Sequence, residues 1–356
     1  MRKICVELPG RGYDICIGEG VLDKCGALIR DVCAWKKALV VTDRNVAALY
    51  LERVCTSLES HGFDVKCVVI PPGEKSKSPA MLQRLYGRLA QFKITRGDGI
   101  VALGGGVVGD VAGFAAATWL RGVPYVQIPT TLLAQVDSSV GGKVAINLPQ
   151  GKNLVGAFYQ PRRVIADVGC VQTLPPRVLS DGMGEVIKYG AIADAKLFQW
   201  SCTQRRNSAG DWAEMVARCC AIKAHVVEQD ERDTGLRMTL NFGHTLGHAI
   251  EQFYKYRKYT HGEAVGIGMV WACEQGERKG VTRPGTANQM RDALVRHGLP
   301  TELDPLGKKK FPEIAKAMAL DKKNVGATAR MVLLEKIGKC KVVISDPPHF
   351  PTDEKI

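Results

Sequence analysis

Apolar runs of strand length alternate with amphipathic segments through the first half of the chain. Two alternating stretches, residues 4–8 and 13–17, flank Pro9-Gly10 and predict an antiparallel hairpin. Four further strands are predicted: 38–42, 63–70, 99–103 and 125–129. Helical periodicity fills three of the intervals: 45–60, 78–92 and 107–120. Because buried strands that alternate with helices pair in parallel through right-handed crossovers, this half predicts an α/β fold with helices on both faces of a parallel sheet.

The pattern changes after Thr173-Leu174-Pro175-Pro176, where strand-like runs nearly vanish. Long periodic segments predict five helices: 179–190, 211–229, 239–253, 262–280 and 289–297. We therefore expect two domains, an α/β domain over residues 1–172 and a mainly α-helical domain over residues 173–356. The last stretch, 345–356, is rich in proline and charge and is expected to form a loose tail.

Composition and charge narrow the class of function. The 356 residues carry 49 basic and 36 acidic side chains, a net charge of +13. This surplus suits nucleic acid or an acidic small molecule, and the absence of a nucleic-acid motif favours the small molecule. No apolar stretch is long enough to span a membrane and no cleavage site follows Met1, so we expect a cytoplasmic protein without a membrane partner. The 12 scattered cysteines contain no Cys-x-x-Cys pair and predict buried, reduced thiols.

A glycine-rich turn, Gly104-Gly105-Gly106-Val107-Val108-Gly109-Asp110, follows a predicted strand and opens a predicted helix. Its glycines would let the backbone approach a pyrophosphate, which the free amides of the helix start would bind, although a tight turn needs glycine in any case. The acidic residue that usually follows about 20 residues later is missing. Asp43, at the end of the first parallel strand, could hold a ribose instead, or it could cap the next helix. The turn therefore predicts a nucleotide loop in a variant α/β fold.

Three of the seven histidines, His244, His248 and His261, lie within eighteen residues. His244 and His248 are four apart and share a helix face, and a third histidine nearby favours metal ligation over an ordinary polar role. Glu185, in a largely apolar segment, would complete the set, but a buried pair with Lys188 would also account for it. Spacing alone makes both His244 and His248 ligands.

Two polar segments and several separate basic residues are further candidates for ligand binding. Asp137 to Lys143 and Gly151 to Asn153 follow the predicted sheet, where α/β enzymes bind their ligands. Lys223, Arg237 and Lys322-Lys323 lie in the helical half. Each is an ordinary surface residue when taken alone. Together they could bind a phosphate and a carboxylate.

Eight strings of the sequence form one ordered pattern: Pro72 to Lys77, Gly104 to Asp110, Pro129 to Thr131, Gln135 to Lys143, Gly151 to Pro161, Glu185 to Gly190, Asn241 to His248 and His261 to Val265. In this pattern the chain resembles the 3-dehydroquinate synthase family, within the sugar phosphate cyclases, over nearly its whole length. So many strings in the right order make a chance match implausible. The resemblance implies an NAD-binding domain over residues 1–172 and a metal- and substrate-binding domain over residues 173–356.

The resemblance also implies the cofactors and their ligands. A divalent metal, zinc or alternatively cobalt, would be bound by Glu185, His244 and His261, and His248 would act beside the metal instead of ligating it. NAD would contact a set of residues on the α/β domain: Asp43, Pro72, Gly73, Glu74, Lys75, Ser76, Lys77, Gly106, Val107, Val108, Gly109, Asp110, Thr130, Thr131, Lys143, Lys152, Cys170, Val171, Gln172 and Thr173.

The implied substrate is a small phosphorylated, carboxylated sugar. Its contacts would be Arg121, Asp137, Lys143, Asn153, Lys188, Lys223, Arg237, Asn241, His261 and Lys322, with Lys323 as the alternative to Lys322. The implied catalytic residues are His248, Lys143, Lys188, Asp233, Arg237 and Asn241. Two positions depart from the family pattern. Asp233 replaces the usual Glu, and Gly184 replaces the common Ala, which would loosen the start of the helix that carries Glu185.

The reaction implied by the resemblance belongs to the shikimate pathway of aromatic amino acid biosynthesis. A homodimeric lyase would convert 3-deoxy-D-arabino-heptulosonate 7-phosphate to 3-dehydroquinate and phosphate. NAD would take a hydride from the fifth carbon, phosphate would leave by elimination, the hydride would return, and an intramolecular aldol would close the ring, with the metal as Lewis acid. The alternatives are another sugar phosphate cyclase, a metal-dependent polyol dehydrogenase of similar fold, and a basic nucleic-acid-binding protein.

Overall fold

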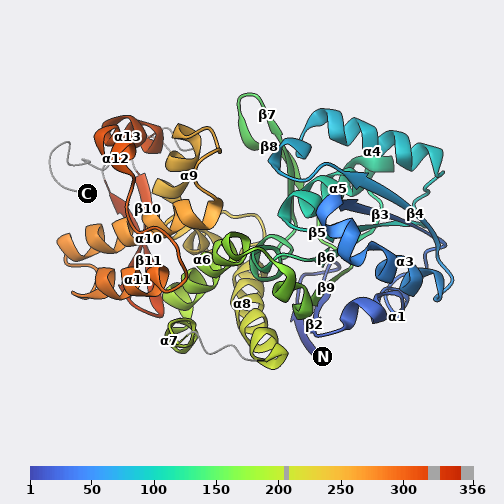
Figure 1. Cartoon of the computed structure of the whole chain (residues 1–356), viewed down its shortest axis with the longest axis horizontal. Coiled ribbons are helices and arrows are strands. Elements are labelled where there is room, and N and C mark those ends of the chain that lie inside the picture. Colours follow the sequence, from blue (N-terminus) through green and yellow to red (C-terminus); the bar gives the residue numbers. More distant parts are fainter. Residues whose placement is uncertain (204–207, 320–328, 346–356) are drawn as a thin grey trace. The chain divides into compact units, whose positions relative to one another are not determined.

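A computed structural model describes residues 1–203, 208–319 and 329–345, and contacts divide them into two compact units. Unit 1 holds the described residues up to Leu174 together with residues 208–232, which contain helix α8 (Ala209–Gln229), and unit 2 holds the other described residues (Figure 1). Helix α8 was expected in the second domain, but it packs against the first two strands of the chain and so groups with unit 1. The domain limit at residues 172 and 173 stays a prediction.

Unit 1 is built on one seven-stranded sheet. Its strands are β1 (Arg2–Val6), β2 (Tyr13–Gly18), β3 (Lys37–Asp43), β4 (Asp64–Ile70), β5 (Gly99–Gly104), β6 (Tyr125–Pro129) and β9 (Arg163–Asp167). They lie in the order β1-β2-β9-β6-β5-β3-β4; β1 is antiparallel to β2, and the other neighbours pair in parallel. The predicted hairpin and the four predicted strands are confirmed. Strand β9, which inserts between β2 and β6, was not predicted.

Helices cover both faces of this sheet (Figure 1). The main ones are α1 (Cys25–Arg30), α3 (Glu52–Glu59), α4 (Pro79–Gln91) and α5 (Gly106–Thr118). On one face Leu85 of α4 and Val111 of α5 pack into a core with Ile100 of β5. On the other face Leu58 of α3 packs into a core with Val101 of β5. Successive residues of β5 thus point into opposite cores, as the parallel-sheet prediction requires.

Short elements complete unit 1. The helix predicted over 45–60 is divided into α2 (Arg44–Val46), the single π-turn η2 (Ala47–Leu51) and α3. Two strands outside the main sheet, β7 (Lys143–Leu148) and β8 (Gly151–Phe158), form an antiparallel hairpin that was not predicted. The remaining turns are η1 (Val21–Lys24), η3 (Glu74–Ser76), η4 (Trp119–Arg121), η5 (Ala134–Ser138) and η6 (Val168–Thr173).

Unit 2 is mainly helical. Its elements are α6 (Pro176–Ala193), α7 (Ala195–Ser201), η7 (Leu236–Asn241), α9 (His244–Phe253), α10 (His261–Arg278), α11 (Thr286–Val295), α12 (Pro305–Lys309), α13 (Phe311–Ala319), β10 (Ala329–Lys336) and β11 (Lys339–Ser345). Helix α10 packs against α6, α9, α11 and β10. The antiparallel β10–β11 hairpin was not predicted. The loose tail was expected over residues 345–356; Ser345 ends β11, and residues 346–356 lie outside the described residues.

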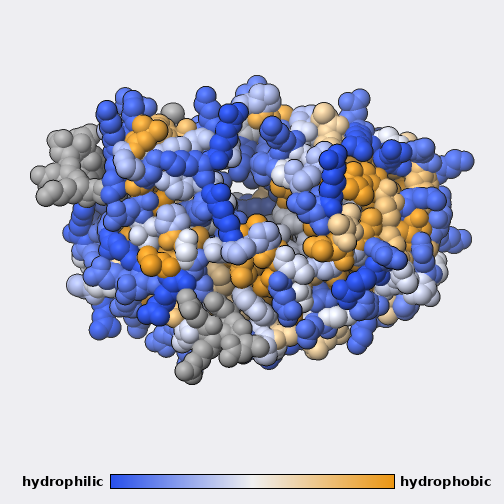
Figure 2. Space-filling view, in the orientation of Figure 1, coloured by the Kyte–Doolittle hydropathy of each residue, from blue (hydrophilic) through white to orange (hydrophobic). Residues whose placement is uncertain are grey.

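The surface and the cysteines agree with part of the sequence analysis. The face drawn in Figure 2 is mostly hydrophilic, with hydrophobic residues in separate patches. Among the described residues, no helix combines the length and the apolar character that crossing a membrane requires. All twelve cysteines are free thiols, but only seven are buried. The expectation of buried thiols is wrong for Cys67 in particular, because β4 is an edge strand and leaves that side chain exposed.

Candidate metal centre and nucleotide loop

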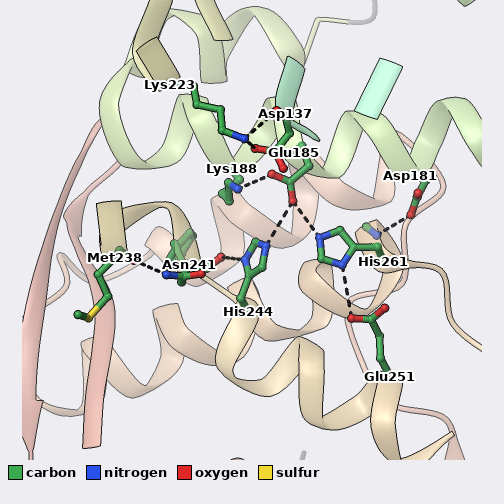
Figure 3. Close-up of polar contacts among 12 residues, drawn as sticks. Asp137, Asp181, Glu185, Lys188, Lys223, Met238, Asn241, His244, Glu251 and His261 are labelled. Carbon is green, nitrogen blue, oxygen red and sulfur yellow. Dashed lines mark hydrogen bonds and ion pairs between the residues drawn. The ribbon is translucent and has the colours of Figure 1, made fainter. Parts of the chain in front are cut away.

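Three helices of unit 2 bring the predicted metal ligands together (Figure 3). His244 is the first residue of α9 and His261 is the first residue of α10, while Glu185 lies in the buried middle of α6. Gly243 precedes α9 with φ 78°, a left-handed conformation that favours glycine. The start of α10 is fixed by Glu263, whose carboxylate accepts the Thr260 amide at 2.9 Å and pairs with Arg177 of α6.

Backbone contacts hold these helices close to one another. A Cβ on Gly268 of α10 would lie 2.0 Å from the carbonyl oxygen of Gly243, so only glycine allows α9 to start against α10. Gly184 lies against the backbone of Gly262, where a Cβ would stand 3.2 Å from the Gly262 Cα. Helix α6 begins at Pro176, so Gly184 lies in its interior. The prediction that Gly184 loosens the start of the helix is therefore wrong.

The carboxylate of Glu185 faces both histidines. Its Oε1 lies 3.7 Å from Nε2 of His244 and 3.5 Å from Nε2 of His261, and the side chain of Glu185 is fully buried (Figure 3). The other oxygen, Oε2, forms an ion pair with Nζ of Lys188, whose side chain is 2% exposed. The sequence left two alternatives for Glu185, a place beside the histidines as a metal ligand and a buried pair with Lys188. One carboxylate serves both arrangements, since Oε1 faces the histidines and Oε2 pairs with Lys188.

The second nitrogen of each histidine ring is also engaged. Nδ1 of His244 lies 3.0 Å from the carbonyl oxygen of Phe242, to which it donates, and Nδ1 of His261 lies 3.4 Å from Oε2 of Glu251. Burial alone would lower the pKa of His261, but its hydrogen bonds to Glu185 and Glu251 outweigh burial and raise this pKa to about 10 in the metal-free protein. Both rings therefore present Nε2 to Glu185.

This donor set fits a divalent metal ion. Two imidazole nitrogens and one carboxylate oxygen are the protein ligands of a common class of catalytic zinc sites, which leave a fourth position open. Ligand atoms about 2.0–2.2 Å from a tetrahedral ion lie roughly 3.3–3.6 Å apart, close to the separations from Oε1 of Glu185. The nearest donor atoms of Glu185, His244 and His261 all lie within 4.8 Å of one another.

His248 occupies a neighbouring position. Its ring centroid is 5.3 Å from that of His244 and 6.2 Å from that of His261. It groups with Glu251 and His261, not with Glu185. Each of these two groups, Glu185–His244–His261 and His248–Glu251–His261, has its donor atoms within 4.8 Å of one another, and the first is the ligand set implied by the family resemblance.

Other predicted site residues of unit 2 lie on or near η7. Arg237 is 2% exposed, and the side-chain amide of Asn241 donates to the carbonyl oxygen of Met238 at 3.1 Å. Asp233 has φ 60°, a conformation that aspartate adopts more readily than glutamate does. This backbone conformation suits the shorter side chain at the position where the family usually has Glu. Lys322 and Lys323 lie outside the described residues.

In unit 1 the predicted NAD contacts other than Lys143 and Lys152 gather at one edge of the sheet. They lie at or after the carboxyl ends of five neighbouring strands: Asp43 ends β3, residues 72–77 follow β4, residues 106–110 follow β5, residues 130–131 follow β6, and residues 170–173 follow β9. This edge is where open parallel sheets bind nucleotides. The glycine-rich turn opens α5 at Gly106, so the first amides of that helix are available to a phosphate.

Polar contacts organise this edge. Nζ of Lys77, which is 6% exposed, forms an ion pair with Asp110. Burial raises the pKa of Asp110, and the positive charge of Lys77 opposes this increase. Oδ1 of Asp43 accepts the amides of Asn45 and Val46 at 2.9 and 3.2 Å, as the helix-cap alternative predicts.

The β7–β8 hairpin and α8 carry further predicted residues of unit 1. Oε1 of Glu74 accepts a hydrogen bond from the side-chain amide of Asn147 at 2.7 Å and lies 4.0 Å from Nζ of Lys152. Nζ of Lys223 donates to the side chain and to the carbonyl oxygen of Asp137, at 2.5 and 2.7 Å.

Three other predicted residues belong to unit 1. Lys143 begins β7 and is exposed. Arg121 is exposed at the end of η4, with φ 67°. Asn153 lies in β8 with φ 55°, and its backbone amide donates to Oδ1 of Asn147 at 3.0 Å.

Sequence analysis missed three polar residues at these sites. Glu251 contacts His261, Asp181 accepts the amide of Gly262 at 2.5 Å, and Asn147 contacts Glu74. A signal existed for two of them. Glu251 follows His248 by three residues, and Asp181 precedes Glu185 by four, so each shares a helix face with a predicted site residue. Asn147 had no such signal, because the hairpin that carries it was not predicted.

A nucleotide loop on a parallel sheet and a Glu–His–His cluster on a helical unit are components of an enzyme that uses a nucleotide together with a metal ion. A family model described as 3-dehydroquinate synthase N-terminal matches residues 67–181, and one described as 3-dehydroquinate synthase C-terminal matches residues 182–324. The 3-dehydroquinate synthase of Clostridium acetobutylicum is 49% identical over 342 residues, which cover 96% of this chain and 95% of the relative. The chain belongs to the 3-dehydroquinate synthase family.

Solved structures of related enzymes share the fold. A 2-deoxy-scyllo-inosose synthase complexed with carbaglucose-6-phosphate, NAD⁺ and Co²⁺ aligns with a TM-score of 0.83 at 25% identity, over 97% of each chain. ValA, a 2-epi-5-epi-valiolone synthase from Streptomyces hygroscopicus with NAD⁺ and Zn²⁺ bound, aligns with a TM-score of 0.80 at 26% identity, over 93% of this chain and 92% of that one. The predicted fold class, an α/β sheet unit followed by a mainly helical unit, is confirmed.

Proposed function

We propose that this chain converts 3-deoxy-D-arabino-heptulosonate 7-phosphate to 3-dehydroquinate and phosphate, with NAD and one divalent metal ion as cofactors. The observation that carries the proposal is the convergence of Glu185, His244 and His261 within a chain that matches both halves of the 3-dehydroquinate synthase family. The cofactors follow from the related enzymes, which are solved with NAD⁺ and Co²⁺ or Zn²⁺.

Unit 2 would hold the metal ion through Glu185, His244 and His261. When bound, the ion supplies a Lewis acid for a substrate hydroxyl and the carbonyl derived from it. His248 lies beside both ligand rings, where it would accept a proton from that hydroxyl directly or through water. We assign Lys188, Arg237 and Asn241 to the carboxylate end of the substrate, since a guanidinium and an ammonium suit a carboxylate.

Unit 1 would hold NAD along the carboxyl-end edge of its sheet, with the pyrophosphate at the start of α5. NAD supplies a reversible hydride acceptor when bound. Lys77 and Asp110 would fix the shape of the loop through their buried ion pair. We assign Arg121, Lys143, Asn153, Lys223 and Lys322 or Lys323 to the phosphate and hydroxyl groups of the substrate. Asp137, which holds Lys223, would orient that lysine.

Two further expectations are part of the proposal. The enzyme would work in the cytoplasm, where its phosphorylated substrate and NAD are found, and it would form a homodimer. Size-exclusion chromatography with light scattering measures the second directly. A mass of about twice 38.7 kDa is expected.

Parallel assays of phosphate and NADH test the proposed function. Purified enzyme with NAD, Zn²⁺ or Co²⁺ and the heptulosonate phosphate should release one phosphate per substrate without net accumulation of NADH. Stoichiometric NADH without phosphate release would support the polyol dehydrogenase instead. Glucose 6-phosphate serves as the control substrate, and phosphate release from it at a comparable rate would favour another sugar phosphate cyclase.

A further inference from the structure

Glu251 is a buried carboxylate beside a predicted metal ligand, and neither the family resemblance nor the sequence pattern assigns it a role. It lies on α9, seven residues after His244, and is 5% exposed. Its Oε2 is 3.4 Å from Nδ1 of His261, and the side chain points toward that ring (Figure 3). Because burying a carboxylate is costly, its place beside an imidazole calls for a functional explanation.

The two ligand histidines are supported differently. Nδ1 of His244 donates to the neutral carbonyl oxygen of Phe242, which lies two residues earlier in the chain. His261 instead relies on the side chain of Glu251, which comes from a different helix. A carboxylate that accepts the Nδ1 proton fixes the ring tautomer, leaves the Nε2 lone pair for a metal and makes that nitrogen a stronger ligand.

We propose that Glu251 is a positioning residue that holds His261 with Nε2 directed at the metal ion. The inference rests on the proposed function, since it assumes that His261 is a ligand. The contact with Glu251 also accounts for a fixed orientation of the His261 ring, although His261 is the first residue of α10. Asp181 and Glu263 anchor the backbone at that helix start, and Glu251 anchors the side chain.

Metal affinity measured without substrate tests this role. Apo protein would be titrated with Zn²⁺ against a chromophoric chelator, comparing wild type with Glu251→Ala and Glu251→Gln. Loss of such a supporting group typically costs about 10- to 100-fold in metal affinity, and we expect Glu251→Ala to fall in this range. Glu251→Gln retains a neutral acceptor for the Nδ1 proton and should lose less. Glu313→Ala removes an equally negative but exposed side chain of unit 2 and should leave the affinity unchanged.

Cobalt absorption adds a readout that a merely structural residue would not change. The visible bands of the Co²⁺-loaded protein report the ligand geometry, so Glu251→Ala should shift them while Glu313→Ala should not. Equal Zn²⁺ affinity and identical bands in wild type and Glu251→Ala would overturn the inference and leave the proposed function intact. Failure of the wild-type protein to bind metal would instead contradict the proposed function itself.

A second inference concerns Cys55 and Cys67, far in sequence from the metal ligands. Cys55 lies on α3 and Cys67 lies on the edge strand β4, and their sulfur atoms are 3.3 Å apart. The hydrogen bond from the Cys55 thiol lowers the pKa of Cys67 and raises the pKa of Cys55. Cys67 is exposed and Cys55 is half-buried, so a small oxidant can reach the pair.

We infer that these two thiols form a reversible disulfide when hydrogen peroxide is present. The Cys67 thiolate attacks one peroxide oxygen, which gives a sulfenic acid and, after protonation of the leaving oxygen, water. The Cys55 sulfur then attacks the sulfenic sulfur and releases a second water, so two thiols and one peroxide give one disulfide and two waters. The bond would close a loop between residues twelve apart and tie α3 to β4.

Thiol counting and peptide mapping test this second inference. One equivalent of peroxide should remove two of the twelve titratable thiols, and a dithiol reductant should restore them. Mass spectrometry should find a peptide linked through Cys55 and Cys67 that is lighter by two hydrogens. Cys67→Ser should abolish the link, whereas Cys5→Ser, which removes another exposed thiol, should not. Oxidation of Cys67 to sulfinic acid without the link, or a link between other cysteines, would refute it.

Discussion

Nε2 of His261 lies 3.5 Å from Oε1 of Glu185, while Oε2 of the same carboxylate pairs with Lys188. One oxygen of the buried Glu185 carboxylate therefore faces the proposed metal site, and the other faces the ammonium group of Lys188. The resident ammonium offsets the negative charge of Glu185 when no metal is bound. It also repels a metal ion that approaches from the histidine side.

Replacing Lys188 by Met should separate these two effects. The apo protein should lose about 3 kcal/mol of stability, because the buried charge of Glu185 loses the ion pair that offsets it. The Zn²⁺ affinity should increase by about tenfold, because one positive charge near the ligands is removed. Urea unfolding of the apo protein and a chelator competition measure the two quantities. A fall in Zn²⁺ affinity would show that Lys188 supports the site instead of opposing the ion.

The Lys77–Asp110 pair in unit 1 allows a double-mutant test. Lys77→Met should destabilise the NAD-free protein by about 3 kcal/mol, because it leaves the buried carboxylate of Asp110 without this partner. Adding Asp110→Asn removes the buried charge and should recover at least half of that loss. Thermal unfolding of the two single variants and the double variant gives the coupling free energy. Additive losses in the double variant would contradict a buried ion pair.

Gly268 tests the close contact between the two helices that carry the histidines. Gly268→Ala places a methyl group 2.0 Å from the Gly243 carbonyl oxygen, so α9 and α10 must move apart. We expect a loss of about 3 kcal/mol of stability, and a drop in Zn²⁺ affinity of about tenfold or more because the movement separates His244 from His261.

Gly87→Ala on the exposed side of α4 is the matched control for this substitution. Nothing lies within 4 Å of its Cβ, and the variant should gain about 0.5–1 kcal/mol. Stability measured by urea unfolding should therefore change in opposite directions in the two variants. A Gly268→Ala protein as stable as the wild type would contradict the close packing of α10 against Gly243.

Asp304 should give unit 2 a stability that depends on pH. Burial alone would raise its pKa, but hydrogen bonds from Lys258 and Tyr254 outweigh burial and lower the pKa to about 2. Because the folded-state pKa lies below the unfolded one of about 3.8, the stabilisation is complete above about pH 5 and is lost as the pH falls toward 2. Asp304→Asn should cost about 1 kcal/mol at pH 7 and progressively less below pH 4. A difference between the two proteins that is independent of pH would refute this.

The regular part of unit 1 was predictable from sequence because its strands and helices have clear periods. The four parallel strands and helices α4 and α5 were found within a few residues. Strand β9 was missed because charged residues stand at both of its ends, Arg163 and Asp167, and leave an apolar run of only three residues. The β10–β11 hairpin was missed because the helical periodicity of the preceding segments led to a mainly helical prediction for the whole C-terminal half.

The metal site was only half predictable from spacing. Histidines four apart predicted a shared helix face, and the structure confirms that His244 and His248 lie on α9. Spacing could not show that His261 and Glu185 converge on His244, because that depends on how α6, α9 and α10 cross at Gly184, Gly262 and Gly268. The family resemblance supplied the ligand set that periodicity could not.

Metal stoichiometry of purified protein tests the central claim most directly. After exhaustive dialysis and reloading, the wild-type chain should bind one Zn²⁺ per chain by calorimetry and elemental analysis. Glu185→Gln should lose this binding by at least about 100-fold and should lose turnover with it, because one of three ligands is gone. One tightly bound Zn²⁺ with unchanged affinity in Glu185→Gln would contradict the assignment of Glu185, His244 and His261 as the metal centre.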